Sequence, residues 1–437
     1  MLSRVGQRRC GASIAAAAFA NVICRPVRPL PPFLSRGGAG SVRGTDIFVR
    51  REQRLAAAAS PQVRNLAAAA PINVNALKVT PAAVPKTKPP FDASLSFGTS
   101  FSDHMLEIEW DVASGFGEPR IVPYHALELD PASPCLHYGV QCFEGMKAYK
   151  DESGAVRLFR PDMNMKRFKT SCERLSLPVF EEEQMLACLK KLIEVDKDWV
   201  PGEPGYSLYI RPTALATSST LGVTPPSHAL FFIITCPVGP YFKAGFAPVK
   251  ILAEEAYRRA WPGGTGCYKI GGNYAPGLLP QRAAAEHGYS QVLWLFGEEQ
   301  YVTEVGSMNL FVFWKNAHGK EELITAPLDG TILPGVTRDS ILTLARTWRE
   351  FEVSERSYTM QEIVDASSEG RLIEAFGAGT AAIVSPIDAI AFQGKELAVP
   401  CGPDGKAGLL AKRLFHSLSD IQYGRKPFDN WSVVAAA

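Results

Sequence analysis

Two periodicities of hydrophobic residues alternate along most of the chain, and they predict a protein of mixed strands and helices. Short apolar and β-branched runs predict strands at residues 155–159, 207–214, 229–236, 249–253, 291–296, 301–304 and 310–314. The run at 229–236 is almost continuously apolar, which predicts burial on both faces. Apolar residues three to four positions apart predict helices at 161–175, from 181 onward, and at 276–287, 337–350 and 409–421. The helical stripes are Leu186, Leu189 and Ile193 in the second helix and Leu410, Leu414, Leu418 and Ile421 in the last.

Proline and glycine mark a boundary between two lobes. Gly239, Pro240 and Gly245 interrupt the pattern after the strand at 229–236. We therefore expect a small N-terminal α/β domain at residues 93–236, an interdomain loop at 237–245, and a larger C-terminal domain of mixed sheets and helices at 246–437. The fold class is α+β or α/β.

The first 65 residues differ in composition from the rest. They carry eleven arginines, no lysine, and only Asp46 and Glu52 as acidic residues. An arginine-rich, acid-poor segment is typical of an organelle transit peptide, and its modest serine content favours the mitochondrial matrix over a plastid. A tail without an address is the alternative. Residues 66–92 contain five prolines and predict a disordered linker, with folding from about residue 91.

The composition of the whole chain excludes several classes of function. With 46% hydrophobic and 21% charged residues in 437, a disordered chain is excluded. Without the leader there are 35 basic and 42 acidic residues, which gives no general attraction for nucleic acid. No apolar stretch reaches the roughly 20 residues of a membrane span. The nine cysteines are scattered and never spaced as CxxC, so no disulfide framework or metal site is indicated and a reducing compartment fits.

The densest cluster of unusual chemistry runs from Trp261 to Tyr274, where five glycines surround Lys269. Glycines at this density allow a backbone to approach a ligand closely. A phosphate-binding nucleotide loop does not fit, because Cys267 stands where the GxxxxGK[ST] pattern needs lysine. Two interpretations remain for Lys269 on this evidence: a buried amine available for a Schiff base, or a lysine in a solvated turn.

Six separated segments share one further property. They are Tyr138-Gly-Val-Gln-Cys-Phe-Glu-Gly-Met-Lys147, Tyr209-Ile-Arg-Pro212, Tyr268-Lys-Ile-Gly-Gly-Asn-Tyr274, Thr303-Glu-Val-Gly-Ser-Met-Asn309, Ile332-Leu-Pro-Gly-Val-Thr337 and Phe376-Gly-Ala-Gly-Thr-Ala381. Together they closely resemble the branched-chain amino-acid aminotransferases, in order from about residue 95 to Gly424. The resemblance implies a two-domain pyridoxal-phosphate enzyme of fold type IV, with its cofactor between the domains.

The resemblance also implies a pyridoxal 5′-phosphate site. Lys269 is then the catalytic lysine that holds the cofactor as the internal aldimine, Tyr274 the hydrogen-bond partner of the phenolic oxygen, and Glu304 the carboxylate that keeps the pyridine nitrogen protonated. The other implied cofactor-binding residues are Arg167, Val336, Thr337 and Thr380 around the phosphate and Leu333 against the ring. The sequence itself agrees for Val336 and Thr337, because they open a predicted helix whose N–H groups attract anions.

For the substrate the resemblance implies an apolar pocket. The matching positions are Phe143, Tyr209, Arg211, Ser307, Ala381 and, from the neighbouring subunit of a homodimer, Tyr138. Such a pocket favours leucine, isoleucine and valine, because desolvating a polar side chain without a partner costs about 1–3 kcal/mol. The implied reaction is ping-pong transamination with 2-oxoglutarate, which gives branched 2-oxo acids and L-glutamate. Arg211 either contacts substrate or braces the wall.

Two alternatives stand beside this interpretation. A sister fold-type IV enzyme, such as a D-amino-acid aminotransferase or an aminodeoxychorismate lyase, shares the lysine and the glutamate, but the segments around Phe143 and Lys269 favour the branched-chain group. A non-catalytic protein of the same fold is expected to have lost one of Lys269, Glu304 and Arg167. Ala382 and Ser385 stand where some animal relatives carry a redox-active CxxC, so no redox switch of that kind is expected. No metal, nucleic-acid or membrane partner is expected either.

Overall fold

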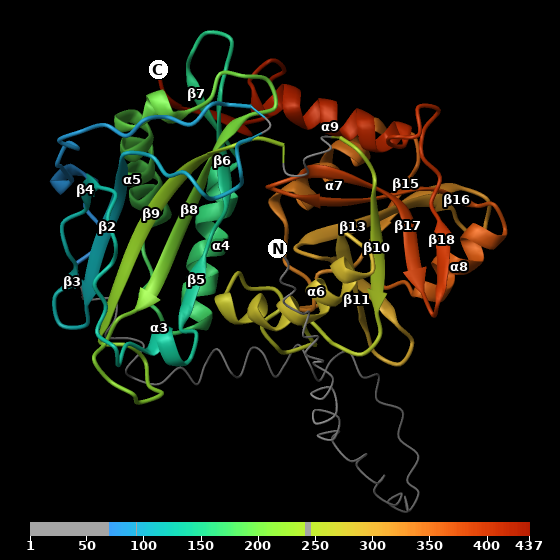
Figure 1. Cartoon of the computed structure of the whole chain (residues 1–437), viewed down its shortest axis with the longest axis horizontal. Coiled ribbons are helices and arrows are strands. Elements are labelled where there is room, and N and C mark those ends of the chain that lie inside the picture. The colour runs from blue at the N-terminus through green and yellow to red at the C-terminus, as the bar shows by residue number, and fades with distance from the viewer. Residues whose placement is uncertain (1–69, 93, 241–245) are drawn as a thin grey trace, which may run out of the picture. The chain divides into compact units, whose positions relative to one another are not determined.

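In the computed structural model, residues 70–92, 94–240 and 246–437 are described. The predicted transit peptide at 1–65 and residues 241–245 of the predicted interdomain loop lie outside them. The described residues build two β-sheets with helices packed against them (Figure 1). Among the described helices, none has the length and apolar character needed to cross a bilayer.

Within the described residues the first sheet has ten strands, and all its pairs except β1–β4 are antiparallel. The order is β1-β4-β2-β9-β8-β6-β7-β19, with β3 beside β2 and β5 beside β8. The strands are β1 (Lys78–Val79), β2 (His104–Asp111), β3 (Gly115–Phe116), β4 (Arg120–Pro123), β5 (Gln141–Phe143), β6 (Met146–Lys150), β7 (Val156–Phe159), β8 (Ser207–Ala216), β9 (His228–Val238) and β19 (Ser432–Ala436). β19 pairs with β7, with Ser432 opposite Phe159. The last strand of the chain therefore forms one edge of the first sheet.

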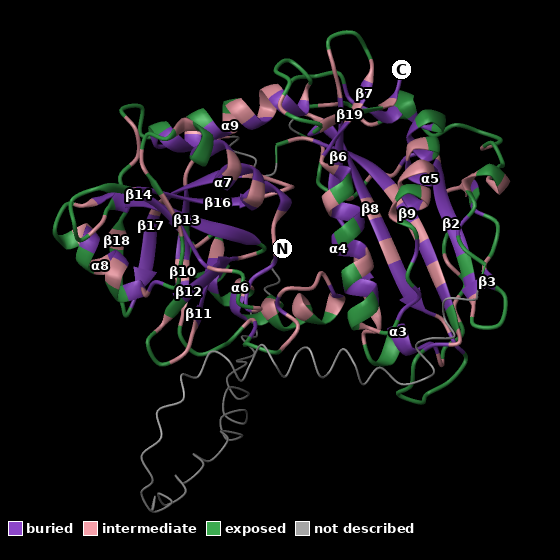
Figure 2. Cartoon of the chain, turned by 180° about the vertical axis from the view of Figure 1, so that it is seen from behind, coloured by how far each residue is buried: buried purple, intermediate pink, exposed green. Residues whose placement is uncertain are grey.

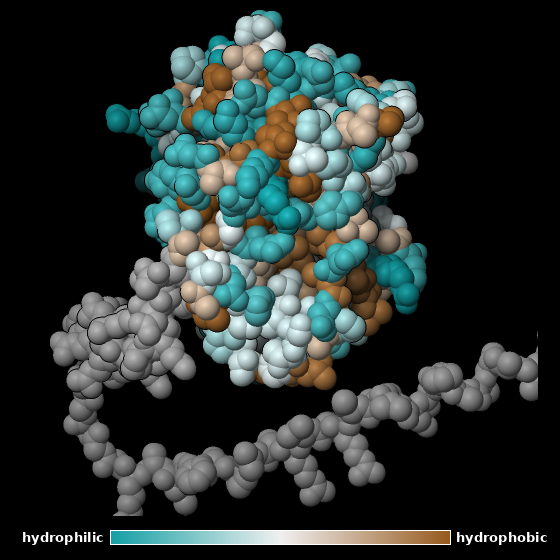
Figure 3. All heavy atoms as spheres, turned by 90° about the vertical axis from the view of Figure 1, so that its left-hand side faces the viewer, coloured by the Kyte–Doolittle hydropathy of each residue, from teal (hydrophilic) through white to brown (hydrophobic). Residues whose placement is uncertain are grey.

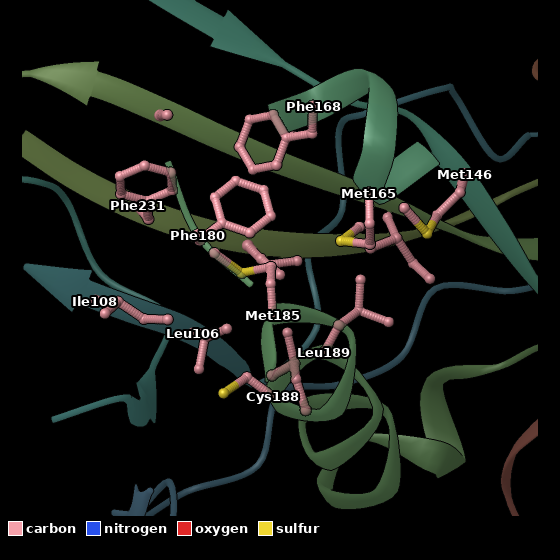
Figure 4. Packing of buried hydrophobic residues seen from close by; sticks show 14 of the residues in the cluster. Leu106, Ile108, Met146, Met165, Phe168, Phe180, Met185, Cys188, Leu189 and Phe231 are labelled. Atoms are coloured by element: carbon pink, nitrogen blue, oxygen red, sulfur yellow. The ribbon is translucent and has the colours of Figure 1, made fainter. Parts of the chain in front are cut away.

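Helices α4 (Pro161–Arg174) and α5 (Glu182–Val195) cover one face of this sheet. The predicted limits of α4 and the predicted start of α5 are confirmed to within one residue. The core that they form with β2 and β9 contains Phe168, Phe180 and Phe231, whose rings meet at 5.4–6.0 Å (Figure 4). A short helix, α3 (Pro134–His137), precedes β5. The buried stripe of α5 is Met185, Cys188, Leu189, Leu192 and Ile193. Leu186, predicted on that stripe, lies at its edge and is only half-buried.

Strand β9 is buried on one face over much of its length. Ala229, Phe231 and Ile233 are buried, whereas the residues between them, from Leu230 to Ile234, are half-buried. The prediction of burial on both faces is therefore wrong for residues 229–234 and confirmed for 235–236. The reason is that antiparallel sheets commonly carry a packed layer on one side alone, and an apolar run does not reveal which side stays open.

The second sheet mixes parallel and antiparallel pairs in the order β12-β11-β10-β17-β16-β13-β14-β15, with β18 beside β17. Parallel pairing joins β10 to β11 and β17, and β14 to β15. The strands are β10 (Val249–Glu254), β11 (Gln291–Phe296), β12 (Tyr301–Val305), β13 (Met308–Lys315), β14 (Glu321–Thr325), β15 (Glu352–Glu355), β16 (Leu372–Gly379), β17 (Ile383–Phe392) and β18 (Lys395–Ala398). All strands predicted in this half are present.

Helices α6 (Leu278–Glu286), α7 (Val336–Trp348), α8 (Met360–Ser368) and α9 (Leu409–Gln422) accompany the second sheet. Each helix predicted here is confirmed, and the four predicted stripe residues of α9 are all buried. α8 escaped the prediction although Thr359 and Glu362 form a capping box at its start. Figure 2 shows the strands of both sheets as the buried layer and the outward faces of the helices as exposed.

Folding begins earlier than the sequence predicts. Ile72 is 2% exposed, β1 pairs with β4, and the backbone N–H of Val74 donates to Gln184 of α5 at 3.0 Å. The predicted disordered linker at 66–92 is therefore wrong for residues 70–80. We call residues 70–80 the N-terminal arm. Its apolar side chains pack into the core beside α5. Its prolines leave enough backbone N–H groups for one short strand.

Candidate active site

A cavity of about 350 Å³ is lined by residues of both sheets. Every site residue predicted from the sequence lines it except Tyr138: Phe143, Arg167, Tyr209, Arg211, Lys269, Tyr274, Glu304, Ser307, Leu333, Val336, Thr337, Thr380 and Ala381. These residues span more than 230 positions of the sequence, so it is the fold that brings them together.

Lys269 lies in the loop between β10 and α6, and the first sheet fixes its backbone. The N–H of Phe143 donates to the carbonyl of Lys269, and the N–H of Lys269 donates to Ser171 Oγ on α4, both at 3.0 Å. Lys269 Nζ donates to Tyr274 Oη at 3.1 Å and lies 4.9 Å from the ring centre of Phe143. Within the described residues no carboxylate pairs with this amine, so the lysine enters the cavity with a phenol as its neighbour.

The glycine-rich segment around Lys269 is a compact loop. The amide of Asn273 donates to the carbonyls of Thr265 and Tyr268, at 2.7 and 2.8 Å, and a short 3₁₀ turn, Gly271–Asn273, brings Tyr274 back beside the lysine. A Cβ on Gly271 would crowd the side chain of Gln141 on β5. Gly271 therefore serves close packing against the first sheet. Because Lys269 lines the cavity, its solvated-turn interpretation is wrong.

Glu304, on β12, is 2% exposed and fully hydrogen-bonded. Its Oε1 accepts from the N–H of Leu333 at 2.7 Å and from Asn309 Nδ2 at 3.2 Å, while Arg259 Nε lies 2.8 Å from Oε2. Burial raises the pKa of the Glu304 carboxyl, and the charge of Arg259 opposes that rise. The paired guanidinium supports a carboxylate in an otherwise apolar place.

Arg167, on α4, carries the cationic side of the cavity. Its guanidinium forms a two-point ion pair with Glu144, Nε–Oε1 2.6 Å and Nη2–Oε2 2.8 Å, and Nη1 donates to the carbonyl of Pro334 at 3.0 Å. Burial tends to lower the pKa of Arg167, but Glu144 outweighs it and the net shift is upward. The guanidinium is thus held charged at the start of α7.

The N-terminus of α7 faces the same place. Its N-cap, Gly335, offers no side chain to the first N–H groups, and Val336 and Thr337 line the cavity. A Cβ on Gly335 would overlap Asn309 Oδ1, so the close approach of this turn to β13 requires glycine. The uncapped N-terminus of this thirteen-residue helix, a hydroxyl and a buried guanidinium together suit an anion.

Aromatic residues of the first sheet form the opposite wall. Arg211, on β8, lies over the rings of Phe143 and Tyr209 at 4.7 and 5.2 Å, and its Nη2 donates to Tyr209 Oη at 3.1 Å. Arg211 Nε is buried and has no acceptor among the described residues. Phe97 packs edge-on against Tyr209 at 5.0 Å. The wall is therefore apolar except for the guanidinium of Arg211, whose Nε–H has no hydrogen-bond acceptor among the described residues.

The apex of the β16–β17 hairpin closes the cavity. Gly379 pairs with Ile383, and Thr380, Ala381 and Ala382 between them all line the cavity. Within the described chain, the backbone N–H groups of these three residues have no protein acceptor. Consecutive free N–H groups in a turn are a common site for an anionic oxygen.

Tyr138 lies away from the cavity. It is 45% exposed at the end of α3, and its hydroxyl donates to the carbonyl of Leu221 at 2.6 Å. In this chain it therefore contributes nothing to the site described above.

Comparison with known proteins adds to this geometry. The family Amino-transferase class IV matches residues 141–390. The branched-chain-amino-acid aminotransferase of Dictyostelium discoideum is 53% identical over 369 residues, which cover 83% of this chain and 96% of that protein. The mitochondrial enzyme of that name from Saccharomyces cerevisiae is 50% identical over 378 residues, covering 86% and 96%. The chain belongs to the branched-chain-amino-acid aminotransferases of class IV.

The fold agrees with this family. A crystal structure of the branched-chain amino acid aminotransferase of Escherichia coli superimposes with a TM-score of 0.60 at 26% identity, over 72% of this chain and 96% of that one. The T.th. enzyme of the same name, solved with pyridoxamine 5′-phosphate, gives a TM-score of 0.59 at 26% identity, over 75% of this chain and 98% of that one. The predicted type IV fold is confirmed.

Sequence reasoning missed four residues that hold this aminotransferase site together, namely Glu144, Lys147, Arg259 and Asn309. Glu144, Lys147 and Asn309 lie inside the segments that carry the resemblance and could have been found there. Arg259 and the wall residue Phe97 lie outside them. Arg259 is one of two adjacent arginines, and nothing in the local pattern distinguishes the one that turns inward from its neighbour.

Proposed function

We propose that this protein transfers the amino group of L-leucine, L-isoleucine or L-valine to 2-oxoglutarate, with pyridoxal 5′-phosphate as cofactor. The observation that carries the proposal is the placement of Lys269 beside Tyr274 in one cavity with the buried Glu304, between an anion site and an apolar wall. The products are the branched 2-oxo acids and L-glutamate. Because the reaction runs in two halves, both amino acids use the same cavity in turn.

The residues present fit this cofactor. Arg167, the start of α7, Thr337 and Thr380 suit a phosphate, Glu304 suits a protonated ring nitrogen, and the side chain of Leu333 is placed for the ring face. When bound, pyridoxal 5′-phosphate supplies an aldehyde that takes up the amino group and a ring that accepts electrons from the substrate α-carbon. The buried ion pair with Arg259 favours the ionised form of Glu304 and so opposes the effect of burial, which raises the pKa of this carboxyl.

Lys269 moves the proton. With the cofactor bound, Lys269 Nζ would act as a free amine that takes the proton from the substrate α-carbon and gives it to the cofactor, which accepts the electrons of that carbon. Tyr274 Oη, 3.1 Å away, orients that amine, and the rings of Phe143 and Tyr274 pack beside it at 4.9 and 5.4 Å. The catalytic role thus belongs to Lys269, and its neighbours position it.

Two features of the cavity suit the two kinds of substrate. The free N–H groups at Thr380–Ala382 would receive the α-carboxylate that all these amino acids share. The wall of Phe143, Tyr209 and Ala381 suits branched apolar side chains, whereas the unused Nε of Arg211 would receive the side-chain carboxylate of glutamate. Arg211 would then contact substrate in one half-reaction and brace the wall in the other.

We further propose that the protein is a homodimer of the mitochondrial matrix. Leu136, Tyr138, Leu221 and Val223 expose apolar surface on the side of the first sheet, 45–80% each, as expected of a face that meets a second copy. Figure 3 shows apolar side chains interrupting the polar surface on that side of the molecule. The arginine-rich leader supports the matrix, although relatives of similar identity include both mitochondrial and cytosolic forms. Light scattering and imaging of the leader fused to a fluorescent protein test the two points.

A panel of amino donors tests the activity. L-leucine, L-isoleucine, L-valine and D-alanine are each supplied with 2-oxoglutarate, and glutamate formation is measured. Activity with the three branched L-amino acids is expected, with little for D-alanine. Preference for D-alanine would instead assign a D-amino-acid aminotransferase. If no donor gives glutamate, the proposal is contradicted.

A further inference from the structure

A second cavity, of about 260 Å³, lies behind the hairpin apex that closes the active site. Ala381 and Ala382 line both cavities, so the turn is a thin partition between them. Among the described residues that line the second cavity there is no Asp or Glu. Ser385 Oγ, which also lines it, is buried and has no hydrogen-bond partner among the described residues.

Lys147 enters this second cavity from β6, where it pairs with Tyr209 of β8. Its side chain is 7% exposed, and Nζ donates to the carbonyl of Ala381 at 2.7 Å. Within the described residues no carboxylate lies in ion-pair distance of it. Burial lowers the pKa of Lys147 to about 8, so the ammonium form still predominates at neutral pH.

The direction of the Ala381 carbonyl decides what the turn presents. In a trans peptide the C=O and the following N–H point in opposite directions. Because Lys147 holds the carbonyl of Ala381 toward the second cavity, the N–H of Ala382 points away from Lys147, on the active-site side of the partition. A hydrogen bond from an ammonium also polarises the peptide and makes that N–H a stronger donor to an anion.

We propose that Lys147 is a positioning residue that holds the Ala381–Ala382 peptide of the turn with the N–H of Ala382 facing the active-site cavity, ready for the carboxylate of the amino-acid substrate. The inference rests on the proposed function, since it needs a substrate that bears a carboxylate. Lys147 acts through the Ala381 peptide and touches no reacting atom. A buried charge without a counter-ion is costly, and a mere brace between two strands could be a neutral side chain.

The test compares a substrate that has the carboxylate with one that lacks it. Lys147→Met removes the charge and the donor, Lys147→Gln keeps a donor, and Lys147→Arg keeps both. Single-turnover rates of the cofactor-loaded enzyme are measured with L-leucine and with 3-methylbutan-1-amine, its decarboxylated analogue. The dissociation constant of 4-methylpentanoate is measured by calorimetry. Lys150→Met, on the same strand but outside both cavities, is the matched control.

In Lys147→Met, the rate with subsaturating leucine should fall roughly tenfold or more and 4-methylpentanoate should bind weaker by a similar factor, while the rate with the amine changes little. Lys147→Gln should fall between Met and wild type, and Lys147→Arg should restore most of the leucine rate. Should Lys147→Met fail to fold, the comparison of Gln with Arg carries the same test.

Equal losses with leucine and the amine would identify Lys147 as a structural brace and overturn the inference. Unchanged rates in all three variants would overturn it too. If the variants give one of these two results but the wild-type enzyme uses leucine normally, only the role of Lys147 is overturned and the proposed function is retained. A wild-type enzyme inactive with every branched amino acid removes both.

Discussion

Glu144 holds the guanidinium of Arg167 at two points, 2.6 and 2.8 Å, and neither side chain is more than 9% exposed. Asn164 Nδ2 and the N–H of Gly145 also donate to Glu144, so its carboxylate is fully satisfied. The pair neutralises a cation that would otherwise be buried without a counter-ion when no anion is bound beside it. Glu144 therefore offsets the free-energy cost of burying the charge of Arg167. The guanidinium keeps its position without a bound ligand.

Glu144→Gln should destabilise the apoenzyme more than the cofactor-loaded enzyme. Removing one partner of a buried pair costs up to about 3–5 kcal/mol, because the other charge is left unpaired. A bound phosphate gives Arg167 another anion and reduces that cost. Denaturant unfolding with and without pyridoxal 5′-phosphate measures both values, with Glu152→Gln, at an 86% exposed side chain, as the control. Equal losses in the two forms would contradict the argument.

The same pair predicts a pH dependence. Burial tends to raise the pKa of Glu144, but Arg167 and the other donors outweigh it, so the pKa in the folded protein lies below the ordinary value of 4.5. The unfolded state then binds more protons, and the pair's contribution to stability is fully present above pH 4.5 and lost as the pH falls through the folded pKa. The difference in free energy of unfolding between wild-type apoenzyme and Glu144→Gln should therefore shrink below pH 4.5. A constant or growing difference would reverse the sign of this argument.

Much of this fold could be predicted from sequence because its signals are local. Helix α9 is fixed by Leu410, Leu414 and Leu418, and α7 by the turn at Gly335 and the apolar residues that follow. What escaped depends on distant partners. β19 is five residues long and exists because β7 offers it an edge, and the arm at 70–80 folds because α5 covers Ile72. The hydrophobic pattern within either segment does not indicate that β7 or α5 will pack against it.

The candidate site divides in the same way. Residues that line the cavity, such as Lys269 and Glu304, stand in recognisable segments. The residues that hold them, such as Arg259, differ from surface charges only in their three-dimensional neighbours. The sequence therefore predicts the residues with chemical roles better than it predicts the residues that hold them in position.

Glu304→Gln should lower turnover without emptying the cofactor site. In the proposed function Glu304 faces the ring nitrogen of the cofactor, so the change removes a negative charge there. Loss of one such electrostatic contact typically costs on the order of 10²–10³ in kcat. Arg167, α7 and Lys269 are untouched, so cofactor should still bind. Absorbance reports bound cofactor and steady-state assays report kcat, with the exposed Glu299→Gln as the control. Full activity in Glu304→Gln would show that the buried carboxylate is structural.

Gly145→Ala should impair substrate binding through Tyr209. A Cβ at position 145 would overlap the hydroxyl of Tyr209, so the ring must move and the aromatic wall with it. KM for leucine should rise several-fold or more while cofactor affinity stays close to that of the wild type. Gly272→Ala is the matched control, because a Cβ there meets nothing within 4 Å. Identical KM values in the two variants would mean that Tyr209 does not form the substrate wall.

Lys269→Ala should abolish turnover. The substitution removes the only amine that lines the cavity within the described residues, and with it both the attachment of the cofactor and the transfer of the α-proton. Losing a positioned proton-transfer group costs about 10²–10⁴ in rate, and losing the attachment adds to that. Borohydride reduction followed by peptide mass mapping should fix the cofactor on the wild-type peptide that contains Lys269 and on none in the variant. Lys250→Ala, whose lysine is exposed and pairs with Glu396 at 2.8 Å, should keep both label and activity. Label on another peptide of the wild type, or near-normal turnover in Lys269→Ala, would move the reacting amine elsewhere.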